Sequence, residues 1–387
     1  MRALALYQVE RFLHLIPVMR LMDTTLREGI QRWGVYFPFR VRREIVRYLA
    51  EIGIEEVELG VVGEERLRGL LLSCRRFPHP PTFSVWLRLR KEDIEKAARL
   101  PEVGFNLSVP VSELQIRRRL RLDPGTLLKK TEELISLAAR YSPCVTLGLE
   151  DASRAEESFI LQICRVSLAA GARRIRISDT LGLLHPLEVI RLVELLKKAF
   201  PETEVGFHGH NDFGLATANA VAALLGGADW VDVSVLGLGE RAGIASLEEV
   251  LAYLYFRQKC QHYRLELLPK LSHYVAWQAG EVIPEFRPVV GRKLFYCESG
   301  LHVDGLKKAP ELYEPFPPEL LGLKRKFSLG AKSGRAALRA LLKEWQLDCP
   351  EEKLGHLLRE IRRRASELGR PLGPEEIKHL LDSLQQK

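Results

Sequence analysis

Two histidines lie two positions apart in the segment GFHGHND, residues 206–212, and an asparagine and an aspartate follow them. In a β-strand, side chains two residues apart point to the same face, so His208 and His210 would share a face if this segment is a strand. Two imidazoles and one carboxylate form a common site for a divalent cation. The pair alone is also compatible with two ordinary buried histidines, so the third ligand decides between these interpretations.

The carboxylate is expected from another element, and Glu28 is the best candidate. It follows Arg27 at the end of the run RLMDTTLRE, residues 20–28. In a closed ring of eight strands, only the eighth strand separates the first from the seventh, so Glu28 would lie near both histidines. Many charges converging at one mouth would be costly unless a cation and anionic ligands balanced them. The other polar residues near predicted strand ends include Asp23, Gln31, Glu58, Arg88, Arg90, Glu150, Asp151, Asp179, Thr180, Asn211 and Asp212.

Short apolar runs alternate with amphipathic stretches between residues 20 and 237. Residues 41–53 show the helical pattern, with four apolar residues on one face and Gly53 after them. The alternation predicts a parallel α/β fold, and eight strands favour a closed (β/α)8 TIM barrel. An open doubly wound sheet is the alternative, but the G-x-G-x-x-G motif typical of it is absent from the sequence. The predicted strands lie at 20–28, 54–60, 82–90, 103–110, 144–151, 173–180, 203–212 and 229–237.

The alternation of apolar runs and amphipathic stretches ends near residue 280. Proline and glycine with little periodicity predict a linker subdomain at 281–331, and renewed amphipathic periodicity predicts a helical subdomain at 332–387. We therefore expect a barrel domain at 1–280 followed by these two parts. The first twenty residues are apolar in patches but carry Glu10, Arg11 and His14 and no small-residue cleavage site. We expect a strand or cap of the fold there rather than a signal peptide.

Composition excludes some classes of protein. The chain has 387 residues, 46% of them hydrophobic, and no run of 18 apolar residues, so we expect a large core and no membrane span. Six scattered cysteines without a C-x-x-C pair indicate a reduced, cytoplasmic protein with buried thiols. The net charge of +8 fits an arginine-rich surface or an anionic small substrate. Nucleic acid is not expected as a partner, because the RRR triplets at 117–119 and 362–364 accompany no recognition motif.

The segments DTTLREGIQ (23–31) and HGHND (208–212) resemble a family of TIM-barrel, metal-dependent acyltransferases and lyases. That family includes the homocitrate, isopropylmalate and citramalate synthases. The resemblance runs over nearly the whole chain and is greatest to homocitrate synthases of the nitrogenase-cofactor type. The further segments that carry it are LSVPVSELQIRRRL, EDASRAE, DTLGLLHP, GLGERAG, ESGLHVDGLKKAPELYEPFPPELLG and SGRAAL.

The resemblance implies a Claisen-type condensation. Acetyl-CoA, the co-substrate, loses a methyl proton, adds to the keto carbon of a 2-oxo acid, and is then hydrolysed to free CoA. With 2-oxoglutarate the product is homocitrate; oxaloacetate, pyruvate and 2-oxoisovalerate are alternatives. A lyase or carboxyltransferase, a metallohydrolase, and a non-catalytic sensor of oxo acids or acyl-CoA stay open as other classes.

The resemblance also implies roles for particular residues. Glu28, His208 and His210 would hold a Zn²⁺, Mg²⁺ or Mn²⁺ ion. Arg27 would stabilise the oxyanion. The residues implied in proton transfer are Glu150, His302 and Tyr313. In the family the segment around His302 reaches into a neighbouring subunit, so a homodimer is implied.

Four substrate contacts are expected, mainly from their positions. Thr180 suits a carboxylate-binding hydroxyl, and Arg90 suits the far carboxylate of a dicarboxylic oxo acid. The other two are Gln31 and Glu58. The chain also departs from the family at four positions. Ile30 replaces a polar residue, Leu236 and Ile244 replace asparagines, and Lys332 replaces a histidine. These departures bear on the choice of substrate and on activity, but they remove no proposed ligand or base.

Overall fold

A computed structural model describes residues 19–385. The chain divides into two compact units, Met1–Val282 and Ile283–Lys387. The strand or cap expected at residues 1–18 lies outside the described residues. Between residues 19 and 385, no helix is long and apolar enough to cross a membrane. All six cysteines are described and free; Cys74 and Cys164 are buried, and the other four are partly buried.

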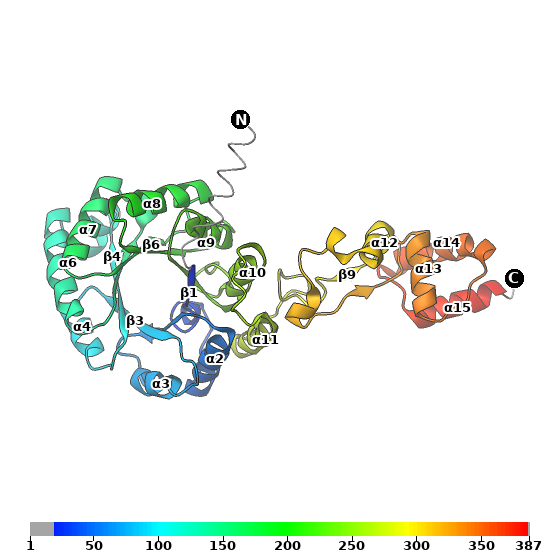
Figure 1. The fold of residues 1–387 in the computed structure, drawn as a ribbon, viewed down its shortest axis with the longest axis horizontal. Helices are drawn as coiled ribbons and strands as arrows, with labels where there is room; N and C mark the ends of the chain where they lie inside the picture. Colours follow the sequence, from blue (N-terminus) through cyan, green and yellow to red (C-terminus); the bar gives the residue numbers. More distant parts are fainter. Residues whose placement is uncertain (1–18, 386–387) are drawn as a thin grey trace. The chain divides into compact units, whose positions relative to one another are not determined.

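Eight strands of the described chain close into one parallel barrel in sequence order, which confirms the predicted TIM barrel (Figure 1). β1 pairs with both β2 and β8, so the sheet is a ring and the open-sheet alternative is wrong. All eight strands fall within the predicted runs or within one residue of them. They are β1 (Arg20–Asp23), β2 (Glu56–Val61), β3 (Thr82–Arg88), β4 (Gly104–Pro110), β5 (Val145–Glu150), β6 (Arg174–Asp179), β7 (Glu204–Gly209) and β8 (Trp230–Val233).

Helices surround the strands and cover their apolar outer face (Figure 1). The first is α2 (Phe39–Ile52), which buries Val41, Ile45 and Leu49. Gly53 follows it with a φ of 99°, a left-handed conformation that ends a helix and that glycine adopts without strain. The other helices of this unit are α3 (Leu67–Cys74), α4 (Lys91–Ala97), α5 (Glu113–Gln115), α6 (Pro124–Ala139), α7 (Glu157–Ala169), α8 (Pro186–Ala199), α9 (Ala216–Leu225), α10 (Leu247–Arg257) and α11 (Leu268–Ala279).

The interior of the barrel is polar, unlike the apolar layers that fill most TIM barrels. The Asn106 amide on β4 donates to Glu58 Oε1 on β2 at 2.8 Å and contacts Met22 Sδ on β1 at 3.5 Å. These strands are not neighbours of β4, so the contacts cross the interior. Arg176 and Asp232 are also buried there. Charged residues therefore lie beneath the mouth where the candidate site is expected.

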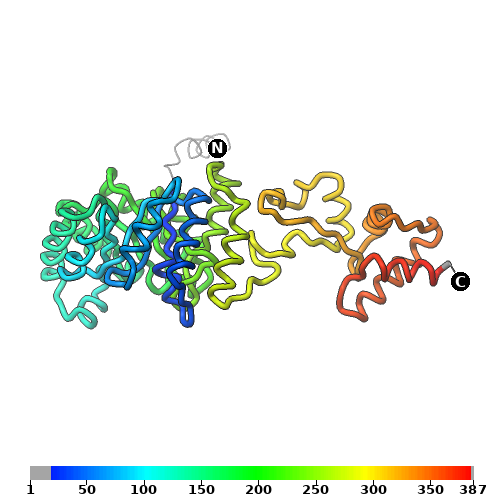
Figure 2. Tube along the Cα trace, turned by 90° about the horizontal axis from the view of Figure 1, so that it is seen from below, coloured from blue at the N-terminus to red at the C-terminus, as the bar shows by residue number. Residues whose placement is uncertain are grey.

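The second unit has its own core (Figure 2, yellow to red). Val303 and Leu329 pack into the same cluster as Leu341 and Leu357 of the later helices. The predicted boundary between linker and helical parts, at 331/332, stays a prediction. The elements of this unit are α12 (Gly300–Lys308), α13 (Arg335–Glu344), α14 (Glu351–Leu368), α15 (Pro374–Gln385) and a parallel pair of β9 (Tyr296–Cys297) and β10 (Lys326–Phe327).

Replacing Leu357 with alanine should lower the free energy of unfolding of this unit by about 2–5 kcal/mol, because the side chain is fully buried and its loss leaves a cavity. Leu368 lies in the same helix but is exposed, so Leu368→Ala should change stability by less than about 0.5 kcal/mol. Urea denaturation followed by tryptophan fluorescence, to which Trp345 on this core contributes, measures both. Equal effects of the two variants would contradict the assigned core.

Candidate metal centre

Glu28, His208 and His210 lie together at the carboxyl-terminal mouth of the barrel. Glu28 follows β1, His208 lies in β7, and His210 follows that strand. One ligand atom from each residue lies within 4.8 Å of the other two, and all three residues are buried. His208 Nε2 is 4.0 Å from Glu28 Oε2, and His210 Nε2 is 4.0 Å from Glu28 Oε1. The two imidazoles therefore direct nitrogen atoms at the same carboxylate.

This geometry fits a divalent cation better than direct hydrogen bonding. A separation of 4.0 Å is too long for a hydrogen bond. Two ligands that each lie about 2.0–2.2 Å from a shared ion are about 3–4 Å apart. His210 Nδ1 is moreover buried without a hydrogen-bond partner among residues 19–385, so hydrogen bonds do not fix this ring. The donor set of two nitrogens and one carboxylate suits Zn²⁺, Mn²⁺ or Mg²⁺.

The chain after β1 is folded so that Glu28 points inward. Asp23 accepts hydrogen bonds from the backbone N–H of Thr25 at 3.0 Å and from its hydroxyl at 2.9 Å, which forms the turn after the strand. The Glu28 carboxylate then accepts from the backbone N–H of Glu240 at 3.0 Å. A Cβ atom at Gly239 would lie 3.2 Å from the Glu28 side chain, so any other residue there would push this carboxylate by a few tenths of an ångström.

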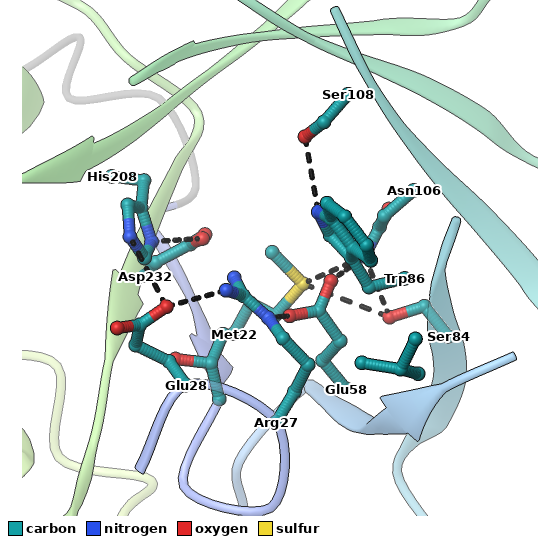
Figure 3. A network of polar contacts seen from close by, with 12 residues as sticks. Met22, Arg27, Glu28, Glu58, Ser84, Trp86, Asn106, Ser108, His208 and Asp232 are labelled. Carbon is teal, nitrogen blue, oxygen red and sulfur yellow. Dashed lines mark hydrogen bonds and ion pairs between the residues drawn. The ribbon is translucent and has the colours of Figure 1, made fainter. Parts of the chain in front are cut away.

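Asp232 on β8 orients His208. Its Oδ2 lies 2.9 Å from His208 Nδ1, which makes Nδ1 the protonated nitrogen and leaves the Nε2 lone pair facing Glu28 (Figure 3). Burial raises the pKa of Asp232 to about 6, against the opposing charge of Arg176. Asp232 is not among the site residues expected from the sequence. The available signal was a lone acid inside the apolar run WVDV, one strand away from the histidines.

Burial lowers the pKa of both His208 and His210, and for His208 the charge of Arg27 acts in the same direction. Both imidazoles are therefore neutral near pH 7, as metal ligation requires. Burial opposes ionisation of Glu28, but the charge of Arg27 and the backbone hydrogen bond from Glu240 act in the other direction, and the pKa of Glu28 is lowered. The site thus combines two neutral nitrogen donors with an ionised carboxylate.

The two residues after the histidines have structural roles. The Asn211 side chain accepts from the backbone N–H of Ala216 at the start of α9, at 3.1 Å. Asp212 pairs with Arg241 at 2.8 and 2.9 Å. These contacts connect the end of β7 to the following helix and to the GLGERAG loop after β8.

Arg27 is held between two carboxylates (Figure 3). Its Nε atom pairs with Glu58 Oε2, and its Nη1 atom pairs with Glu28 Oε2 at 2.5 Å. Glu58 is completely buried, and Asn106 donates to its other oxygen. Burial alone would raise the pKa of Glu58, but the charges of Arg27 and Arg176 lower it to about 2. Arg27 itself is 6% exposed, so its remaining N–H donors lie close to the mouth.

Two other predicted residues lie at neighbouring strand ends. Glu150 ends β5 and pairs with Arg119 from the segment after α5. Thr180 follows β6; its hydroxyl accepts from the backbone N–H of Asp151 at 2.8 Å and makes a long contact of 3.5 Å with the carbonyl of Ser178. The Thr180 O–H proton is therefore only weakly engaged, which leaves it able to donate to a carboxylate.

Gln31 and Arg90 are exposed, and no described side-chain hydrogen bond or ion pair connects either to the buried cluster. Gln31 lies in a short helical turn after Glu28, and Arg90 directly precedes α4. Arg88, two residues earlier, is instead paired with Asp93 at 2.8 Å. The substrate-binding roles of Gln31 and Arg90 stay predictions.

His302 and Tyr313 belong to the second unit, where they lie side by side. Their ring centroids are 4.3 Å apart. A Cβ atom at Gly305 would overlap the Tyr313 ring, so this glycine of α12 permits the tyrosine to pack on the helix. Both rings line a cavity of about 380 Å³ with apolar walls that include Phe295 and Phe316.

The family departures occupy defined positions. Leu236 has a φ of 59°, a left-handed conformation that asparagine tolerates better than leucine. Ile244 is buried and forms an isolated bridge with His210, whose Nδ1 has no partner in the described part of the chain. Ile30 is partly buried beside Glu28, and Lys332 is exposed in the second unit.

The fold and this cluster define a TIM-barrel protein with a candidate metal centre at its carboxyl-terminal mouth. Residues 18–275 match the family described as HMGL-like, and residues 289–382 match the homocitrate synthase post-HMGL domain-like family. The first match alone covers the whole barrel, and the second covers most of the other unit.

Several similar proteins are synthases. 2-Isopropylmalate synthase 2 of Caldanaerobacter subterraneus subsp. tengcongensis is 35% identical over 94% of this chain and 95% of its own. Homocitrate synthase 1 of Nostoc sp. is 34% identical over 93% of this chain and 96% of its own. 2-Phosphonomethylmalate synthase of Streptomyces rubellomurinus is 35% identical over 92% of this chain and 96% of its own.

Solved structures support the fold. Hydroxymethylglutaryl-CoA lyase from Pseudomonas aeruginosa superposes with a TM-score of 0.62 at 19% identity, covering 69% of this chain and 95% of the lyase. The carboxyl transferase domain of Rhizobium etli pyruvate carboxylase superposes with a TM-score of 0.55 at 18% identity, covering 70% of this chain and 48% of that one. From the matched families and the full-length relatives, the chain belongs to the HMGL-like family, among the 2-isopropylmalate, homocitrate and citramalate synthases.

Replacing His208 with alanine should abolish stoichiometric binding of Zn²⁺ or Co²⁺, because it removes one of three ligands. His185→Ala is the matched control, since His185 is a half-exposed residue that caps α8. Elemental analysis after dialysis and titration of the metal-free protein measure the stoichiometry. Retention of one tightly bound ion by His208→Ala would contradict the assigned ligand set.

Proposed function

We propose that this protein is a divalent-metal-dependent acyltransferase that condenses acetyl-CoA with a 2-oxo acid. The observation that carries the proposal is the buried cluster of Glu28, His208 and His210 beside Arg27. Synthase relatives aligned over more than nine-tenths of the chain support it. They align along the second unit as well as the barrel, whereas the lyase structures cover 69% of the chain or similar shares.

The electrostatics of the site suit an anionic substrate. Two arginines and three carboxylates are buried together, so the cluster carries 2 − 3 = −1 charge with neutral histidines; they are Arg27, Arg176, Glu28, Glu58 and Asp232. A bound divalent cation would change this to +1, which one substrate carboxylate neutralises. When bound, the cation would supply a Lewis acid for the keto and carboxylate oxygens of the oxo acid.

Arg27 is proposed to stabilise the negative charge that develops on the keto oxygen. Its guanidinium has five N–H donors, and the contacts with Glu58 and Glu28 engage Nε and Nη1. Glu58 has no exposed surface and accepts from both Arg27 and Asn106. We therefore propose that Glu58 acts on the substrate only through Arg27.

His302 is proposed as the base that removes the methyl proton of acetyl-CoA, with Tyr313 beside it and Glu150 assisting proton transfer. A positioned base contributes about 10²–10⁴-fold to rate. The apolar cavity that both rings line can exclude water from a thioester. His302 and the metal ligands lie in different units of the chain. We propose that a neighbouring subunit supplies His302 and that the enzyme is a homodimer.

2-Oxoglutarate is the proposed oxo acid, with homocitrate and CoA as products. Thr180 would bind the carboxylate next to the keto group, Arg90 would bind the far carboxylate, and Gln31 would contact the substrate near Glu28. The second-unit match to the homocitrate synthase domain supports this choice. The 2-isopropylmalate synthase relatives favour 2-oxoisovalerate as the second candidate substrate. Oxaloacetate and pyruvate are the remaining candidates.

Thiol release should be observed when the metal-loaded protein is incubated with acetyl-CoA and 2-oxoglutarate, and EDTA should abolish it. The same assay with oxaloacetate, pyruvate and 2-oxoisovalerate identifies the preferred oxo acid. Glu28→Gln is the negative control because it weakens the metal site. Absence of thiol release with every oxo acid and every metal would refute the proposal and favour a non-catalytic binding protein.

Mixing two inactive variants tests the shared site. Glu28→Gln and His302→Ala should each be inactive, and co-refolded at equal amounts they should recover about a quarter of wild-type activity, because half of the dimers contain one intact site. Co-refolding Glu28→Gln with His208→Ala provides the control, since both changes affect the same barrel and no site is restored. No recovery in the first mixture would show that His302 acts within its own subunit or not at all.

A further inference from the structure

Arg176 is a buried cation whose role the proposed reaction does not assign. It lies in the middle of β6, is 2% exposed, and is among the largest side chains of the interior. Its Nη1 atom lies 3.0 Å from Asp232 Oδ2 on β8 and 3.5 Å from Glu58 Oε1 on β2. Neither β2 nor β8 neighbours β6, so the side chain extends across the barrel.

Glycines on both adjacent strands make room for this side chain. In the sheet register, Arg176 is paired with Gly148 on β5 and with Gly206 on β7. A Cβ atom at Gly148 would lie 3.5 Å from Arg176 Nε, and one at Gly206 would lie 3.7 Å from Arg176 Cγ. Both are ordinary contact distances, so only a side chain that extends beyond Cβ on either strand would compete with Arg176 for space.

The contacts of Arg176 complete a closed ring of polar contacts. One arm runs through Asp232 to His208, because the same Asp232 oxygen lies 2.9 Å from His208 Nδ1. The other arm runs through Glu58 to Arg27. Arg27 pairs with Glu28, which faces His208 Nε2, and this closes the ring. The six members come from the turn after β1 and from β2, β6, β7 and β8.

The two carboxylates need a buried positive charge between them. Counting the ion pairs among residues 19–385, Asp232 would lose its one arginine partner without Arg176, and Glu58 would keep Arg27 as its one cationic partner. A buried carboxylate that loses its partner moves toward other donors or toward solvent. Movement of Asp232 would release the His208 ring, and movement of Glu58 would release Arg27.

We propose that Arg176 is a positioning residue that holds the ligand His208, through Asp232, and the guanidinium of Arg27, through Glu58, in one fixed arrangement. It touches neither the cation nor the substrate. The proposal rests on the proposed function, since it assumes a cation on Glu28 and the two histidines. Its measurable consequence is metal affinity, because groups that orient a ligand typically change affinity by about 10–100-fold.

Arg176→Met tests this role against Arg174→Met as a matched control. Arg174 lies two residues earlier on the same strand, is 3% exposed, and pairs with Glu56 at 3.0 Å and Glu204 at 3.4 Å. The described contacts of these partners do not reach the metal ligands. Both variants lose a buried arginine, so both should lower the melting temperature of the metal-free protein. Only Arg176→Met should weaken Co²⁺ binding, by about 10–100-fold, with a changed Co²⁺ absorption spectrum.

Arg176→Lys, which keeps the charge but not the fork of donors, should restore part of the affinity. If Arg176→Met does not fold, Arg176→Gln replaces it, with the same loss of affinity expected. Wild-type Co²⁺ affinity in the neutral variant, or an equal loss in Arg174→Met, would overturn the proposal while leaving the metal site intact. Failure of the unmodified protein to bind Co²⁺ would overturn the proposed function, and this inference with it.

Discussion

The pairing of Arg27 with two buried carboxylates is the interaction on which the site depends. Removing charges from water is costly unless each has a partner, and here one guanidinium serves both Glu28 and Glu58. Glu28 is left with its oxygens facing two neutral imidazoles. Each buried carboxylate has a cationic partner, but the cluster as a whole keeps a net negative charge. A cation bound between Glu28 and the two histidines would balance that charge. The same ion pairs thus stabilise the buried charges and leave the negative charge that the proposed cation needs.

The division of the chain matters for function. The barrel carries the candidate ligands and Arg27, and the second unit carries His302 and Tyr313 beside an apolar cavity. HMG-CoA lyases share the barrel fold, whereas the synthase relatives align along both units. The synthase relatives thus match the second unit as well as the barrel, and the proposed base lies in the second unit.

The departures from the family change the surroundings of the centre more than the centre itself. Ile244 lies beside His210, and no described hydrogen bond fixes the Nδ1 of that ring, whereas Asp232 fixes His208. The two histidines are thus held unequally. Leu236 has a left-handed backbone in a loop that also carries Gly239 and Glu240 at the Glu28 carboxylate.

Local pattern in the sequence determined the eight strands, the helix at 39–52 and the meeting of Glu28 with His208 and His210. The strand period follows from short-range spacing, and the count of eight strands favoured a closed barrel. The tertiary structure alone revealed Asp232 and Arg176 as partners and placed Glu58 behind Arg27. The contacts of Arg176 with Asp232 and Glu58 join strands that are not adjacent in the sheet. They depend on the stagger of the strands and on the space left by Gly148 and Gly206, which no local pattern specifies.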